Sequence, residues 1–146
     1  MAARGLGALI LVDSNVIIDV IAKDPVWFVW SLDQLDGRHD DDLVVNQMVI
    51  AEVAPRFGTL ERFRHEINTL GIGFDEYGAD VAFEAGRSFV AYRQNRGKDA
   101  PSLPLPDFFI GGHAQVLGYT ILTRDPRFYR TYFSEVPLIT PSKDET

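Results

Sequence analysis

Four acidic residues, Asp13, Glu52, Asp107 and Asp125, stand in segments that a folded chain could bring together. Asp13 directly follows an apolar run, residues 8–12, and Asp125 comes soon after a second apolar run. Continuous apolar runs are typical of parallel strands covered on both faces, and open α/β sheets bind ligands at the edge where such strands end. Asp107 opens a predicted helix, and Glu52 lies on the flank of another. The four carboxylates could therefore converge at one edge of a sheet.

Convergence of carboxylates is costly, because like charges repel one another and burial removes their solvation. A hard divalent cation reverses that penalty, and Mg²⁺ prefers oxygen ligands while keeping several of its waters. One or two such ions can activate a water molecule and stabilise the leaving oxygen of a phosphodiester. The four acids are therefore predicted to form a catalytic site for Mg²⁺, with Mn²⁺ as a substitute.

Each acid also has a structural explanation of its own. Asp125 precedes a proline and could cap a helix, and Asp107 in a first helical turn would favour the helix macrodipole. Glu52 could be a solvated helix residue. Asp13 is the hardest to explain structurally, because a turn after a buried strand does not require an acid. The catalytic interpretation rests on the four acids taken together.

The elements that must position these acids alternate between apolar runs and helical patterns. Such alternation favours crossover units and a parallel sheet, so the sequence predicts an α/β fold. Strands are expected at residues 8–12, 43–45, 72–74, 119–122 and 137–139. Helices are expected over residues 24–37, 46–57, 59–70, 79–95 and 107–117, and from residue 125 onward.

Composition excludes several classes of protein. A length of 146 residues suits one domain, and a hydrophobic content of 46% can fill its core. A net charge of −7 argues against a bulk basic nucleic-acid binder or a membrane-surface protein. The lack of cysteine excludes disulfides, zinc thiolates and thiol catalysis. With no signal-peptide pattern and no apolar stretch of membrane-spanning length, we expect a cytoplasmic protein.

Four short motifs carry a resemblance to PIN-domain proteins, in particular to VapC-type toxins of toxin–antitoxin systems. Singly the motifs are weak, but their order and separation along nearly the whole chain are specific. They are residues 11–19 (LVDSNVIID), 49–53 (VIAEV), 105–114 (LPDFFIGGHA) and 122–128 (LTRDPRF). Ser14 stands where the family more usually has threonine, and the fourth acid varies within the family.

The resemblance implies a single PIN domain over residues 1–146, with flexible ends at about 1–7 and 141–146. It implies a three-layer α/β/α fold with a central, mostly parallel sheet of four or five strands. The four acids match the family's catalytic and metal-binding positions, Asn15 matches a polar residue that supports Asp13, and Thr123 matches a small hydroxyl residue near the fourth acid. A Mg²⁺-dependent endoribonuclease toxin that cleaves tRNA or rRNA, forms a homodimer and is silenced by a VapB-type antitoxin is therefore expected.

Trp27 and Trp30 lie near the start of a predicted helix, and both fall largely off its core-facing stripe. Ordinary core packing would explain them, because aromatic side chains usually pack inside. The functional alternative is an exposed apolar groove that accepts an antitoxin helix.

Arginines gather at two places in spite of the acidic total. Arg93 lies near the end of the long predicted helix, and Arg124 and Arg127 flank the fourth acid. Favourable charges at a helix end and a solvated face would explain them. The functional hypothesis is contact with RNA phosphates beside the metal site.

Two other functions remain open from the sequence. One is an acidic pocket that transfers phosphoryl groups, but haloacid-type phosphatases need a second aspartate at the position of Asn15, and receiver domains need a pair of neighbouring acids. The other is a catalytically silent PIN-like module that binds RNA or protein. Such modules usually lose acids from the cluster, whereas all four positions are filled here.

Overall fold

The computed structural model describes residues 9–38, 42–97 and 105–142. In this part of the chain a five-stranded sheet has the order β3-β2-β1-β4-β5, and every neighbouring pair is parallel. The strands are β1 (Ile10–Val12), β2 (Leu43–Val45), β3 (Gly73–Phe74), β4 (Thr120–Leu122) and β5 (Leu138–Ile139). The predicted α/β class and parallel sheet are confirmed.

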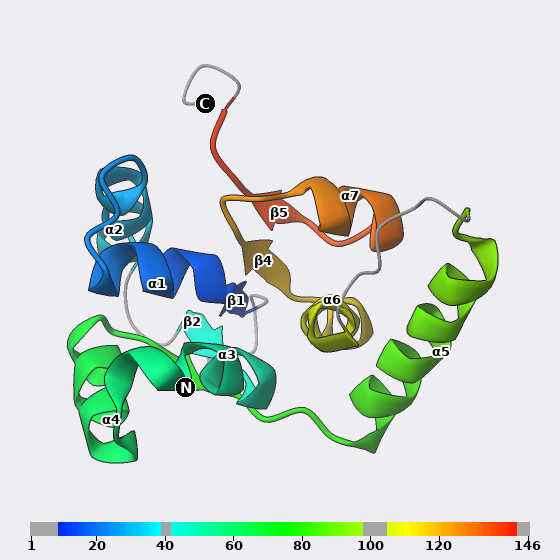
Figure 1. The fold of residues 1–146 in the computed structure, drawn as a ribbon, viewed down its shortest axis with the longest axis horizontal. Helices are drawn as coiled ribbons and strands as arrows, with labels where there is room; N and C mark the ends of the chain where they lie inside the picture. Colours follow the sequence, from blue (N-terminus) through cyan, green and yellow to red (C-terminus); the bar gives the residue numbers. More distant parts are fainter. Residues whose placement is uncertain (1–8, 39–41, 98–104, 143–146) are drawn as a thin grey trace.

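The helices form two layers around the sheet. They are α1 (Ser14–Ile21), α2 (Phe28–Asp36), α3 (Gln47–Phe57), α4 (Leu60–Thr69), α5 (Ala79–Asn95), α6 (Leu105–Leu117) and α7 (Arg127–Tyr132). Figure 1 shows α1 to α4 on one side of the sheet and α5 to α7 on the other. No helix in the described ranges has the length and apolarity needed to cross a membrane.

The three inner strands are apolar because helices cover both of their faces. Leu11, Val12, Val45, Ile121 and Leu122 are all fully buried. Parallel sheets are covered in this way by their crossover helices, which explains the continuous apolar runs in the sequence. The register pairs Val12 at the end of β1 with Leu122 at the end of β4. The residues that follow these two strands therefore emerge side by side.

Local capping signals set several helix boundaries as predicted. The Asn46 side chain accepts a hydrogen bond from the backbone N–H of Val49 at 3.0 Å and starts α3. Thr59 starts α4 in the same way, through the N–H of Arg62 at 3.1 Å. Such caps satisfy backbone donors that have no partner inside the helix.

The predicted start of α2 is wrong. The helix expected from residue 24 begins only at Phe28. The Asp24 side chain accepts hydrogen bonds from the N–H groups of Val26 and Trp27, both at 2.9 Å. The aspartate therefore organises a turn before the helix, as short polar side chains commonly do.

Helix α6, which carries Asp107, is held close to its neighbours by two glycines. A Cβ atom at Gly111 would overlap the ring of Phe133, and one at Gly112 would touch the backbone of Ala85 in α5. The absence of side chains at these two positions lets α6 approach both neighbours.

Candidate active site

Three of the predicted acids line one cleft at the carboxyl edge of the sheet. Asp13 follows β1, Asp125 follows β4, and Asp107 lies in the first turn of α6. The cleft has a volume of about 120 Å³ and is lined by Asp13, Ser14, Asn15, Asp107, Asp125, Phe128 and Tyr129. Segments far apart in the sequence thus meet where strands β1 and β4 end.

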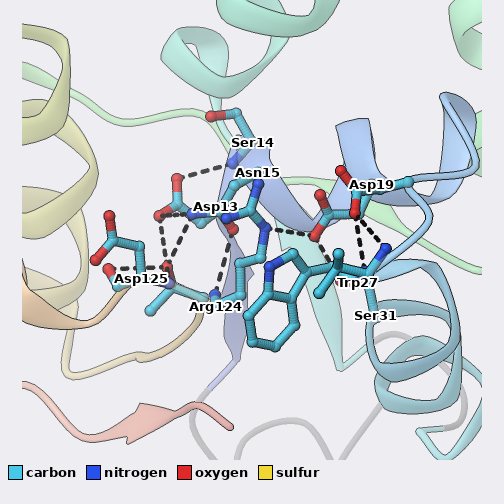
Figure 2. Close-up of polar contacts among 11 residues, drawn as sticks. Asp13, Ser14, Asn15, Asp19, Trp27, Ser31, Arg124 and Asp125 are labelled. Carbon is cyan, nitrogen blue, oxygen red and sulfur yellow. Dashed lines mark hydrogen bonds and ion pairs between the residues drawn. The ribbon is translucent and has the colours of Figure 1, made fainter. Parts of the chain in front are cut away.

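Asp13 is the most tightly held of these acids. Its carboxylate caps α1 by accepting a hydrogen bond from the N–H of Ser14 at 2.8 Å. The Thr123 hydroxyl donates to Oδ2 of Asp13 at 2.9 Å, and Asn15 Nδ2 lies 3.5 Å from the same oxygen. Figure 2 shows these contacts at the start of α1. Asn15 and Thr123 therefore both contact the first acid, and Thr123 also accepts a hydrogen bond from the backbone N–H of the fourth, Asp125.

Tyr129 of α7 is a site residue that the sequence analysis missed. Its side chain is buried, and its hydroxyl donates to Oδ2 of Asp13 at 3.0 Å. Burial raises the pKa of Tyr129 well above its usual value, and the nearby charge of Asp13 adds to the effect. The phenol therefore stays protonated and remains a donor to Asp13. Its place four residues after Asp125 is a signal that could have found it.

The pKa of Asp107 depends on the charges of the other three acids as well as on burial. Its pKa is raised to about 7, first by burial and then by the charges of Asp13, Glu52 and Asp125. Burial also raises the pKa of Asp13, although hydrogen bonds from Thr123, Tyr129 and Ser14 oppose that shift. Burial and the neighbouring carboxylates therefore both disfavour the charged form of Asp107, and no cation among the described side chains offsets them.

Glu52 lies beside the cleft rather than in its lining. Burial raises its pKa, and the charge of Asp13 adds to that shift. Its Oε1 atom is buried and has no hydrogen-bond partner among the described residues. A buried carboxylate oxygen without a partner is costly, so this atom fits a site that a cation completes.

The donor set suits a hard cation, but the site is open. Among the described residues, no group of three or more acidic or histidine side chains is placed to hold a metal ion. Mg²⁺ usually takes only one or two carboxylates from a protein and fills its other positions with water. Two of the clustered carboxylates would therefore suffice to hold it.

Comparison with known proteins agrees with this geometry. A family model described as "PIN domain" matches residues 10–134. The chain belongs to the PIN-domain family. No curated protein matches this PIN domain significantly in sequence.

Solved structures share the fold of this PIN domain at low sequence identity. The VapBC2 complex of Rickettsia felis, bound to a DNA fragment from its promoter, aligns with a TM-score of 0.65 and 16% identity, over 92% of this chain and 99% of that one. A toxin–antitoxin complex from Klebsiella pneumoniae aligns with a TM-score of 0.63 and 21% identity, over 93% and 98% of the two chains. FitAcB from Neisseria gonorrhoeae aligns with a TM-score of 0.64 and 22% identity, over 90% of this chain and 96% of that one. At these identities the similarity establishes the fold.

Asp125 does not act as the helix cap that its position before Pro126 suggested. Helix α7 is preceded by Pro126, and the structure gives its first turn no side-chain cap among the described residues. Instead, Oδ1 of Asp125 accepts a hydrogen bond from Nε of Arg127 at 3.2 Å, and half of the Asp125 side chain is exposed. The PIN domain thus leaves this acid accessible at the mouth of the cleft.

The three arginines proposed to contact RNA differ in their surroundings. The side chain of Arg127 is 88% exposed beside Asp125. Arg93 is exposed near the end of α5, with its guanidinium 5.8 Å from the ring centre of Phe89. Arg124, in contrast, donates from Nε to the buried Asp19 at 2.7 Å. The side chains of Arg127 and Arg93 are therefore exposed to a ligand, whereas Arg124 is paired with a buried carboxylate.

Trp27 and Trp30 are both partly buried, and their rings form an edge-to-face pair with centres 6.2 Å apart. Trp30 packs against the hydrophobic core. Val26 and Val29 beside them are 71% and 66% exposed. An apolar surface therefore exists at the start of α2, although the core packing of Trp30 explains one of the two tryptophans.

Proposed function

We propose that this PIN domain is a Mg²⁺-dependent endoribonuclease that cleaves structured RNA such as tRNA or rRNA. The observation that carries the proposal is the convergence of four acids at one sheet edge, where burial and then the charges of Asp13, Glu52 and Asp125 raise the pKa of Asp107 to about 7. Such a cluster is unfavourable by itself and becomes favourable with a bound divalent cation. PIN domains are typically nucleases, which agrees with that chemistry.

In this proposal Asp13 and Asp107 hold the cation, and Glu52 and Asp125 complete its surroundings. A Mg²⁺ ion held by these residues would supply Lewis-acid activation of a water molecule and charge neutralisation at the scissile phosphate. Thr123 and Tyr129 fix the Asp13 carboxylate by donating to its Oδ2 atom. Their hydrogen bonds oppose the rise in the pKa of Asp13 that burial causes, which favours the ionised form that binds a cation.

The proposed biological role is that of a VapC-type toxin. The solved structures with the same fold are described as toxin–antitoxin complexes. We propose that this chain likewise pairs with a VapB-type antitoxin, that it forms a homodimer, and that Arg127 and Arg93 contact RNA. The surface around Trp27 and Trp30 is the proposed antitoxin groove. A pull-down with the cognate antitoxin tests the groove, because Trp27→Ala with unaltered binding would exclude it.

An RNA cleavage assay tests the nuclease function. Purified protein is incubated with tRNA and rRNA in Mg²⁺ or in EDTA, and the products are resolved on a sequencing gel. We expect cleavage only with the cation and none in Asp13→Asn. Asp36→Asn is a matched control because it removes one exposed carboxylate at the far end of α2. Cleavage by Asp13→Asn at the wild-type rate would contradict the proposed site.

A further inference from the structure

The side chain of Arg124 points away from the cleft even though Arg124 sits between two site residues, Thr123 and Asp125. Its Nε atom donates to Oδ2 of Asp19 at 2.7 Å, and the Asp19 side chain is only 1% exposed. Figure 2 shows Arg124 with Asp125 on one side and Asp19 on the other. Most surface ion pairs are weak and solvated, whereas here one partner is almost completely buried.

Further contacts draw three elements together around this pair. The Ser31 hydroxyl of α2 donates to the same Asp19 oxygen at 2.9 Å. The guanidinium carbon of Arg124 lies 5.6 Å from the centre of the Trp27 ring, within the range of a cation–π contact. The backbone N–H of Arg124 donates to Oδ1 of Asn15 at 3.3 Å. Arg124 is thus bound to α1 at two places and to the α2 region at a third.

These contacts determine where the connection between β4 and α7 lies. Asn15 and Asp19 both belong to α1, whose first turn begins at Asp13. The N–H of Asp125 donates to the Thr123 hydroxyl at 3.1 Å, and that hydroxyl donates to Asp13. A shift of residues 123–125 relative to α1 would therefore move two site residues away from Asp13.

We infer that the Asp19–Arg124 ion pair is a positioning device that holds Thr123 and Asp125 against Asp13. The inference rests on the proposed nuclease function and changes the role expected for Arg124. The arginine acts through its neighbours and not as a ligand of RNA. Asp19, which is too buried to touch a substrate, is part of the same device.

Three variants separate positioning from RNA contact. Arg124→Gln removes the cation and leaves Asp19 as a buried charge with Ser31 as its remaining side-chain donor. Asp19→Ala removes the buried charge and releases Arg124. The double variant Asp19→Asn with Arg124→Gln replaces the ion pair by two amides that can hydrogen-bond to each other. Arg130→Gln is the matched control, because Arg130 is an exposed arginine on α7.

Steady-state cleavage of a defined RNA gives the first readout. We expect kcat to fall by roughly tenfold to a hundredfold in Arg124→Gln and in Asp19→Ala with little change in KM, the range expected for a small misplacement of site residues. The double variant should recover most of the lost kcat. If Arg124 were an RNA ligand, Asp19→Ala would keep wild-type kcat and the double variant would be no better than Arg124→Gln. That pattern would overturn the inference.

Hydrogen exchange provides a readout that does not depend on activity. Amides of residues 122–125 should exchange faster in Arg124→Gln and Asp19→Ala than in Arg130→Gln, and the double variant should restore their protection. Unchanged exchange would contradict the positioning role. If wild-type protein cleaves no RNA, the proposed function fails, but faster exchange with restoration would still support the device. If Arg124→Gln does not fold, Asp19→Ala still tests the inference, because Asp19→Ala removes the buried carboxylate itself.

Discussion

Asp107→Asn is expected to make the metal-free protein more stable at pH 8 while abolishing RNA cleavage. In the folded state the pKa of Asp107 is raised from 3.8 to about 7, mainly by burial. Between these pH values the unfolded carboxyl ionises while the folded one keeps its proton. The free energy of unfolding therefore falls as the pH rises from about 4 to 7 and stays low above that range.

The size of the effect follows from the shift. One pKa unit corresponds to about 1.4 kcal/mol, so a rise from 3.8 to about 7 gives an upper limit of about 4 kcal/mol. Asp107 is only partly buried, and solvent screening reduces this to about 2 kcal/mol. Asparagine carries no charge and avoids this cost. For a domain of this size, about 2 kcal/mol should raise Tm by roughly 6–8 °C.

Thermal unfolding in EDTA at pH 4.5 and pH 8 provides the assay. Asp107→Asn should gain stability at pH 8 and much less at pH 4.5, where the wild-type carboxyl is protonated in the folded state. Asp36→Asn should show no such pH-dependent gain. Added Mg²⁺ should stabilise the wild type at pH 8 and Asp107→Asn far less. An equal gain at both pH values, or a loss at pH 8, would refute the argument that burial and the neighbouring negative charges raise the pKa of Asp107.

Four further substitutions test the site and the packing around it. Tyr129→Phe removes a hydrogen-bond donor to Asp13, so it should lower the free energy of unfolding by about 1–2 kcal/mol. It should also move the acidic limb of the pH–rate profile to higher pH, and a limb that stays in place would argue against that hydrogen bond. Gly111→Ala should cost about 1–3 kcal/mol in urea unfolding because its Cβ would overlap Phe133. Gly86→Ala, where the described residues leave open space, should be neutral or stabilising. Arg127→Gln should weaken RNA binding and reduce the slope of log K against log salt by about one; an unchanged slope would exclude a phosphate contact.

Features set by neighbouring residues could be predicted from the sequence. The caps at Asn46 and Thr59 depend on a side chain and a backbone N–H three residues away, so the sequence reveals them directly. The bounds of α5, Ala79–Asn95, also match the prediction. The apolar runs predicted the strands because burial on both faces requires apolar residues at every position.

Features made by contacts between distant segments could not be predicted. Tyr129 and Asp13 are 116 residues apart, and Arg124 and Asp19 are 105 apart. No local pattern pairs such residues. The sequence therefore suggests RNA contact for Arg124 and no role for Asp19, whereas the structure pairs the two side chains.

His113 shows the same limit. Its ring is buried, with Nδ1 3.1 Å from Asn46 Nδ2 and Nε2 3.2 Å from Asp75 Oδ2. These contacts join α6 to the ends of β2 and β3. Burial lowers the pKa of His113, so the ring is neutral and accepts from Asn46 while donating to Asp75. From the sequence it was one histidine on an apolar helix.

A crystal structure of the protein grown with Mn²⁺ tests the central claim most directly, because anomalous scattering locates the ion without reference to activity. We predict one or two peaks in the cleft, within bonding distance of carboxylate oxygens of Asp13 and Asp107. Saturating Mn²⁺ with no peak in the cleft, or peaks only at acids elsewhere on the surface, would contradict the account.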